Sequence, residues 1–188
     1  SNRMVMYRLG YKDSSLCVER VGGNYVITIT NSKGRNITLT DRQWMTFTTI
    51  FKEVDDAITS IVNWEHYTEF LRAIGGGWHV AVVTACHPSN CVSIRRYYRR
   101  GQRMCSSRQG ITLDMYEWES MLESVLPMMM KDLPSMSSTK PYHCNNIRFR
   151  SNDCYVECPT CCKYAGGQNI DLEITRQRHY REITWTFL

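Results

Sequence analysis

The chain has 188 residues, of which 43% are hydrophobic and 22% charged, and its formal net charge is +5. This composition is ordinary for a globular protein and provides for one good core or two small ones. No apolar run approaches the roughly 20 residues that span a bilayer, so a membrane partner is not expected. Nine cysteines, an odd number, and the lack of a secretory leader argue against a disulfide-linked secreted protein and predict an intracellular one.

The chain begins with four strand patterns, which are followed by a helix pattern. Alternating apolar and polar residues predict strands at 5–10, 14–21, 25–30 and 37–39. Thr40 and Gln43 then form a capping box, in which a hydroxyl and an amide satisfy backbone N–H groups at a helix start. A helix is therefore predicted over Asp41–Val62. Its apolar side chains recur at helical spacing and form one stripe, made of Trp44, Phe47, Phe51, Val54, Ile58 and Ile61.

The same plan is repeated between residues 69 and 129. Strand patterns occupy 69–75, 78–85, 91–98 and 111–113. Asp114 and Glu117 form a second capping box, which predicts a helix over Met115–Met129. Pro127 is expected to end or kink this helix, because proline lacks a backbone N–H and its ring collides with the preceding turn.

The two strand-to-helix junctions have nearly the same sequence, ITLTDRQW and ITLDMYEW, and recur in the same place within each copy. Such an ordered recurrence predicts a duplicated domain. We therefore expect an α+β fold with two tandem units at 4–64 and 65–130, each a four-stranded antiparallel sheet plus a helix. Trp44 and Trp118 lie on the apolar stripes, so they are expected in the core and not on a binding surface.

The two junctions, the helix segment FKEVDDAI and the strand SIRRYY together resemble the family of single-stranded-DNA-binding transcriptional coactivators called positive cofactor four. The resemblance covers about residues 4–62 and 68–130. It implies that the two units pair through antiparallel helices as an intrachain pseudo-dimer. It also implies that they present a joined, curved sheet surface to unpaired DNA.

Charge is distributed unevenly in the second unit. No Asp or Glu occurs between Phe70 and Leu113. Arginine binds phosphates and stacks on bases, and aromatic faces accept any base, so the two together are typical of a surface for unpaired nucleic acid. The alternative interpretation is a solvated basic hairpin on an ordinary sheet. The arginines and aromatic residues of this span include Arg72, Arg95, Arg96, Arg99, Arg100, Arg103, Arg108, Trp78, Tyr97 and Tyr98.

The family resemblance assigns roles within this span. The family's DNA-contacting arginine and tryptophan correspond to Arg95 and Tyr98. Its basic loop before the fourth strand corresponds to Met104–Gly110, with Arg108 as the matching cation. The nucleic-acid contacts expected from the second unit are Arg95, Arg96, Tyr97, Tyr98, Arg99, Arg100, Arg103 and Arg108.

The first unit is expected to contribute less to binding. Its loop before the fourth strand is the short NSKGR, and it lacks the run of arginines and aromatic residues. Lys33 and Arg35 are the predicted phosphate contacts, and Arg20 is a weaker candidate. The second unit should therefore dominate the affinity for nucleic acid.

The composition changes after the second helix. Residues 131–142 have the composition of a linker or an ordered loop, and 143–188 form a cysteine-rich segment with two alternating strand patterns. This cysteine-rich β extension matches no family known to us. It could add a sheet, dock a protein or mediate further self-association.

The cysteine-rich segment contains one pair with metal-ligand spacing. Cys158 and Cys161, separated by two residues, suit two thiolate ligands of one tetrahedral zinc ion. Cys144 and Cys154 are the predicted third and fourth ligands, and the substitutes are His143, Cys162 and His179. Buried free thiols or disulfides are the alternatives to this structural zinc, and no other cofactor is expected.

Catalytic motifs are lacking in the sequence. It contains no Gly-rich phosphate loop before a helix, no zinc-hydrolase helix motif and no nucleophile elbow. The glycine run within Ala73–Trp78 lies between two strand patterns and is predicted to be a turn. A non-enzymatic protein is therefore expected, and a nuclease with metal in the cysteine cluster is the weakest hypothesis.

Two functional hypotheses from different classes follow from these patterns. The first is a single-stranded nucleic-acid-binding protein, with DNA preferred over RNA, acting in transcription regulation or in viral DNA replication or packaging. It would work in the nucleus, at a viral replication site or in the virion, with transcription or replication proteins as further partners. The second is a structural or interaction module that keeps the duplicated fold and assembles through its C-terminal segment.

Overall fold

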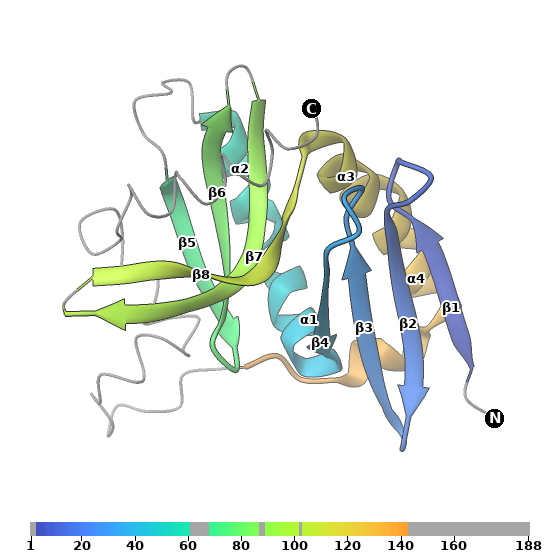
Figure 1. Cartoon of the computed structure of the whole chain (residues 1–188). Helices are drawn as coiled ribbons and strands as arrows, with labels where there is room; N and C mark the ends of the chain where they lie inside the picture. Colours follow the sequence, from blue (N-terminus) through green and yellow to red (C-terminus); the bar gives the residue numbers. More distant parts are fainter. Residues whose placement is uncertain (1–2, 61–67, 87–88, 102, 143–188) are drawn as a thin grey trace.

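The computed structural model describes residues 3–60, 68–86, 89–101 and 103–142 (Figure 1). These residues form two four-stranded antiparallel sheets, and helices follow each sheet in the chain. The predicted α+β class is confirmed, and the arrangement is consistent with two tandem units. The two strand patterns predicted in the cysteine-rich segment lie outside the described residues.

The first sheet is a simple meander of four neighbouring strands. They are β1 (Met4–Arg8), β2 (Ser15–Val21), β3 (Asn24–Thr30) and β4 (Asn36–Thr40). Val18, Ile27 and Leu39 are paired across adjacent strands, and all three side chains are buried against the helices. The predicted first helix is divided at Ile50, whose ψ of 4° departs from helical values, into α1 (Asp41–Thr49) and α2 (Phe51–Ser60).

The second sheet repeats the meander with longer strands. They are β5 (Thr68–Gly75), β6 (Trp78–Cys86), β7 (Ser89–Arg100) and β8 (Arg103–Leu113). The prediction of a basic loop over 104–110 is therefore wrong. These residues belong to β8, and their pairing with β7 changes register after Arg95. Figure 1 shows the outer half of the β7–β8 hairpin bending away from the direction of the other strands.

The second helical region is continuous in spite of its proline. It comprises α3 (Met115–Ser120), the π-helical turn η1 (Met121–Val125) and α4 (Leu126–Asp132). Pro127 lies in the first turn of α4 and does not end the helix, contrary to one of the two expectations. The wider turn accounts for this, since the N–H of Leu126 bonds the carbonyl of Met121, five residues back, just before the proline. A 3₁₀ helix, η2 (Pro134–Ser138), follows, and its Met136 is buried in the core.

An aromatic cluster joins the helices of the two units. The ring of Trp118 lies 5.4 Å from that of Phe51, and Phe51 in turn contacts Trp44 at 5.8 Å. Farther along, Trp44 and Met129 line one apolar groove. The beginning of one helical region therefore lies near the end of the other, so the two run in opposite directions.

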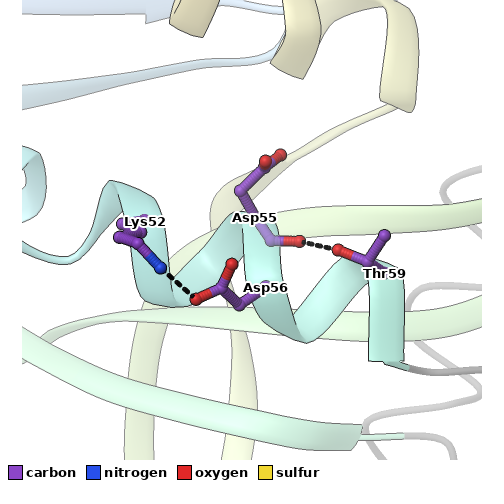
Figure 2. Close-up of polar contacts among 4 residues, drawn as sticks. All are labelled: Lys52, Asp55, Asp56 and Thr59. Carbon is purple, nitrogen blue, oxygen red and sulfur yellow. Dashed lines mark hydrogen bonds and ion pairs between the residues drawn. The ribbon is translucent and has the colours of Figure 1, made fainter.

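The helix α2 is held on two sides. On its exposed side, Lys52 Nζ lies 2.8 Å from Asp56 Oδ2, and the Thr59 hydroxyl donates to the carbonyl of Asp55 (Figure 2). Asp55 also accepts a hydrogen bond of 3.4 Å from the indole N–H of Trp118. None of the helices in the described part of the chain is long and apolar enough to cross a membrane.

Both capping boxes form, and the N3 residue of each, Gln43 or Glu117, also makes hydrogen bonds to the other unit. The Gln43 amide donates to the carbonyl of Gly75, at the end of β5, over 3.1 Å. In the second box, the Glu117 carboxylate accepts from the Ser14 hydroxyl at 2.7 Å and from the Ser32 N–H at 3.0 Å. The repeated sequence thus makes a helix start and an inter-unit contact at the same position in each copy.

Candidate nucleic-acid interface

A cleft of about 470 Å³ lies where the two sheets meet. One wall is the turn before β4 and the start of that strand. The other wall comes from the start of β6 and the middle of β7 and β8. The side chain of Arg35 crosses between the walls and donates to the carbonyl of Arg108 over 2.8 Å. The cleft is lined by Gly34, Arg35, Asn36, Ile37, Thr38, Trp78, Arg96, Arg108, Gln109 and Gly110.

The lining of the cleft is positively charged. It contains three arginines, Arg35, Arg96 and Arg108, and no acidic side chain occurs among the described residues that line it. Arginine presents up to five N–H donors in a planar fork that matches phosphate oxygens. The cleft therefore combines residues predicted in both units, Arg35 from the first and Arg96 and Arg108 from the second, into one site suited to an anion.

The outer half of the β7–β8 hairpin continues this basic surface. Arg100 and Arg103 face each other across the hairpin and are exposed, and Tyr98 is 43% exposed. Lys33, in the turn before β4, is also exposed. The side chain of Arg99 lies outside what the structure describes. The side chains of Tyr98, Arg100, Arg103 and Lys33 are thus open to solvent, as their predicted role in binding requires.

Arg95 departs from the sequence-based expectation, because it is completely buried. Its guanidinium donates to the Ser93 hydroxyl at 2.8 Å, to the carbonyl of Ser107 at 3.0 Å and to the Thr112 hydroxyl at 3.1 Å. Gly110 lies directly opposite and has no room for a Cβ atom beside Arg95. Arg95 thus bonds within the sheet and is closed to solvent, which does not favour its expected role as a DNA contact; that role stays a prediction.

Tyr97 is likewise 95% buried, so it offers no open stacking surface. Its ring lies 5.3 Å from the imidazole of His79, which is fully buried. Burial lowers the pKa of His79 to about 4, and the imidazole is therefore neutral at physiological pH. Within the described chain, its Nε2 atom has no hydrogen-bond partner. This polar cluster belongs to the interior of the second sheet.

Two further arginines contact other side chains of the protein. Arg72 lies 3.3 Å from the carboxylate of Glu53 on α2 and stacks on the ring of Phe70 at 4.5 Å. The guanidinium of Arg20, the weak candidate of the first unit, lies 5.8 Å from the ring of Tyr25. The arginine side chains of the acid-free span that the structure describes are thus divided between interior and surface.

The predicted zinc ligands, Cys144, Cys154, Cys158 and Cys161, all lie outside the described residues. In the described ranges, no group of three or more His, Cys, Asp or Glu side chains is arranged to hold a metal ion. Cys17 is a free cysteine there. The zinc site stays a prediction.

No protein-family model matches the chain, and no curated protein shows a significant match to it. The resemblance to positive cofactor four therefore stays a hypothesis based on the residues that carry it.

The cleft also contains residues that sequence reasoning did not select. Asn36 and Gln109 contribute amide side chains to its lining, and Trp78 was noted only as an aromatic residue within the basic span. The tandem glycines before Trp78 were the available signal, because they mark a backbone that can approach another group closely. Their contact with Arg96 depends on the pairing of β6 with β7, which no local pattern reveals.

Proposed function

We propose that this protein binds single-stranded nucleic acid, preferring DNA, through the cleft between its two units and the adjoining β7–β8 hairpin, without catalysing a reaction. The observation that carries the proposal is the set of three arginines, drawn from both units, in a cleft lined by no acidic side chain of the described chain. The biological setting we propose is transcription regulation or viral DNA replication or packaging, in the nucleus or at a viral replication site.

In this proposal both units are needed for binding, because the cleft is lined by residues from each of them. We infer that the two units act as an intrachain pseudo-dimer, and two observations support this inference. The N3 residue of each capping box makes a hydrogen bond to the opposite unit, and the two helical regions run in opposite directions at their contact. Neither unit alone would supply all three cleft arginines.

The size of the cleft favours a single strand over a duplex. A volume of about 470 Å³ falls within the range of sites that enclose a small molecule or a nucleotide-sized group. The exposed Tyr98, Arg100 and Arg103 would then follow the strand outward along the hairpin. Aromatic and arginine side chains together accept unpaired bases and backbone without a fixed sequence.

Fluorescence anisotropy with a labelled unpaired oligonucleotide, its duplex and an RNA of the same sequence tests the proposal at two salt concentrations. The unpaired DNA should bind most tightly, and the Arg35→Ala/Arg108→Ala variant should lose about tenfold or more in affinity. Its log–log salt slope should fall by roughly 0.7 for each phosphate that is no longer neutralised. The matched control is Lys131→Ala/Lys140→Ala, which removes two exposed cations from outside the cleft.

Two results would contradict the proposal. Equal affinity of the Arg35/Arg108 variant and the Lys131/Lys140 control would place binding elsewhere. A failure of all three nucleic acids to bind would favour the structural or interaction module instead.

A further inference from the structure

The turn between β5 and β6 is a run of three glycines with positive φ. Gly75, Gly76 and Gly77 have φ values of 106°, 61° and 80°, which side chains with a Cβ rarely adopt. The carbonyl of Gly76 accepts a hydrogen bond of 2.6 Å from Arg96 Nη1. A Cβ atom at Gly77 would lie 2.9 Å from the same nitrogen. This turn therefore fixes the position of the Arg96 guanidinium and leaves just enough space for it.

The guanidinium of Arg96 is also stacked on an aromatic ring. Its Cζ atom lies 4.8 Å from the centre of the Trp78 ring, which is 91% buried. Arg96 and Trp78 are opposite each other in the pairing of β6 with β7, so the strand register itself sets this stack. Both residues line the cleft. One face of the guanidinium is thus covered by the indole, and the half-buried Arg96 side chain is part of the cleft lining.

The way Arg96 is held favours stacking over phosphate binding. In Arg96 the bond to the Gly76 carbonyl and the contact with the Trp78 ring together fix the plane of the guanidinium, and a fixed plane suits stacking. The planar face away from Trp78 needs no hydrogen bond to hold a base. Asn36 and Gln109, which also line the cleft, have uncharged amides that can donate to and accept from a base edge.

We propose that Arg96, fixed between the Gly76 carbonyl and the Trp78 ring, is a stacking platform for one base of the bound strand. Arg35 and Arg108 hold the adjoining phosphates in this arrangement. The inference rests on the proposed function, since it names the part of a nucleic acid that this same cleft takes. It assigns to the cleft a nucleotide with its base, and not a backbone segment alone.

Arg96→Lys tests the platform, because lysine keeps the charge but has no planar face. With an unpaired oligonucleotide, this variant should bind at least about fivefold more weakly, the lower end of what one stacked base contributes. With an oligonucleotide of the same length made only of abasic sites, it should bind as tightly as the parent protein. Arg42→Lys is the matched control, since the exposed Arg42 also lies over an aromatic ring, that of Tyr142 at 4.1 Å, but is outside the cleft.

Gly77→Ala tests the turn independently of the charge. The added Cβ should displace the guanidinium and weaken binding of the base-containing strand in the same way, with abasic binding unchanged. Gly23→Ala is its control, because Gly23 has a similar φ of 87° and a Cβ atom added there would meet nothing within 4 Å. Thermal melting of both variants shows whether either is merely misfolded.

The outcomes separate the inference from the proposed function. If Arg96→Lys loses affinity equally for base-containing and abasic strands, Arg96 is a phosphate contact and the inference is overturned while the proposed function holds. The same conclusion follows if the parent protein binds both strands equally well. If neither strand binds, the proposed function has failed and the inference fails with it.

Discussion

The two sheets share a register but differ on the face that points away from the helices. Ile27 pairs with Leu39 in the first sheet as Val92 pairs with Leu113 in the second, so Thr30 and Arg95 occupy equivalent positions. Thr30 is half-buried, whereas Arg95 is fully buried. The first face is thus partly open to solvent, and the equivalent strand position of the second is closed.

The hairpin that follows explains part of this difference. The strands β3 and β4 have 7 and 5 residues, whereas β7 and β8 have 12 and 11. The longer hairpin changes register after Arg95, and a register shift of this kind bends a strand and increases its twist. One repeated plan of strands and helix can therefore carry two different surfaces. On the longer hairpin, Arg100, Arg103 and Arg108 are exposed, and Arg96 is half-buried.

The largest effect on the comparison is expected from Arg95→Ala. Removing the buried guanidinium breaks its three hydrogen bonds and leaves the hydroxyls of Ser93 and Thr112 without this donor. The free energy of unfolding should fall by about 3–5 kcal/mol. Thr30→Ala, the equivalent change in the first sheet, should cost less than about 1 kcal/mol. Urea unfolding of both variants measures the contrast. A stable Arg95→Ala protein that has lost affinity for single strands would instead support the predicted role of Arg95 as a DNA contact.

The next effect concerns the inter-unit contact of Glu117. Glu117→Ala removes the acceptor of the Ser14 hydroxyl and the Ser32 N–H, and should cost about 2–4 kcal/mol in chemical unfolding. Gln43→Ala removes one bond between neutral groups to Gly75, beside its local cap, and should cost about 1–2 kcal/mol. Equal costs would mean that the two units contribute alike to the interface.

Glu117 also predicts a pH dependence of stability. Burial raises the pKa of its carboxyl above the ordinary value of 4.5, although the bond from Ser14 works against this shift. Just above pH 4.5 the unfolded chain therefore releases a proton that the folded chain keeps, and stability falls as pH rises through the raised pKa. Glu117→Gln should remove this part of the fall in stability with pH, because glutamine does not titrate. The prediction would be contradicted if the free energies of unfolding of parent and variant differed by the same amount from about pH 4 to about pH 7.

A smaller effect, on binding alone, is expected from the hairpin. Arg100→Ala/Arg103→Ala should reduce the log–log salt slope for an unpaired oligonucleotide by roughly 0.7 for each phosphate left without its arginine, with folding unchanged. The control is Arg8→Ala/Lys12→Ala, which removes two exposed cations from the first unit, outside the cleft. If the control flattened the slope as much, the first sheet would contribute to binding as strongly as the hairpin.

The smallest effect is expected from Lys33→Ala. This side chain is exposed in the turn before β4, next to the cleft but outside its lining. Its removal should weaken single-strand binding by less than the Arg100/Arg103 change at every salt concentration, as measured by anisotropy. A reduction as large as that of the hairpin variant would show that the units contribute evenly.

The sequence predicted well those features that depend on neighbouring residues. Both capping boxes formed as expected, and Trp44 and Trp118 are in the core, because cap geometry and helical periodicity are local. The burial of Arg95 could not be foreseen in this way. It depends on Ser107 and Thr112, which the β7–β8 register brings close, and on the space left by Gly110.

The cleft was predicted only as separate residues. Arg35, Arg96 and Arg108 were each expected to bind nucleic acid, but their meeting in one site depends on how the sheets are joined. Pro127 illustrates the opposite error, since the local rule was sound but a π-helical turn accommodated the proline. Local chemistry predicted the elements, and the contacts between them determined the surfaces.

The double role of the capping boxes has a consequence for the order in which the chain is made. A ribosome completes α1 before it reaches Gly75, so Gln43 can cap its own helix but must wait for its long-range acceptor. Glu117 is in the reverse situation, because Ser14 and Ser32 have been synthesised long before it appears. If domains fold as they emerge, the first unit can act as a preformed template, and the second helix can dock as soon as it starts. Two nearly identical junctions would then enter the fold at different moments and by different routes.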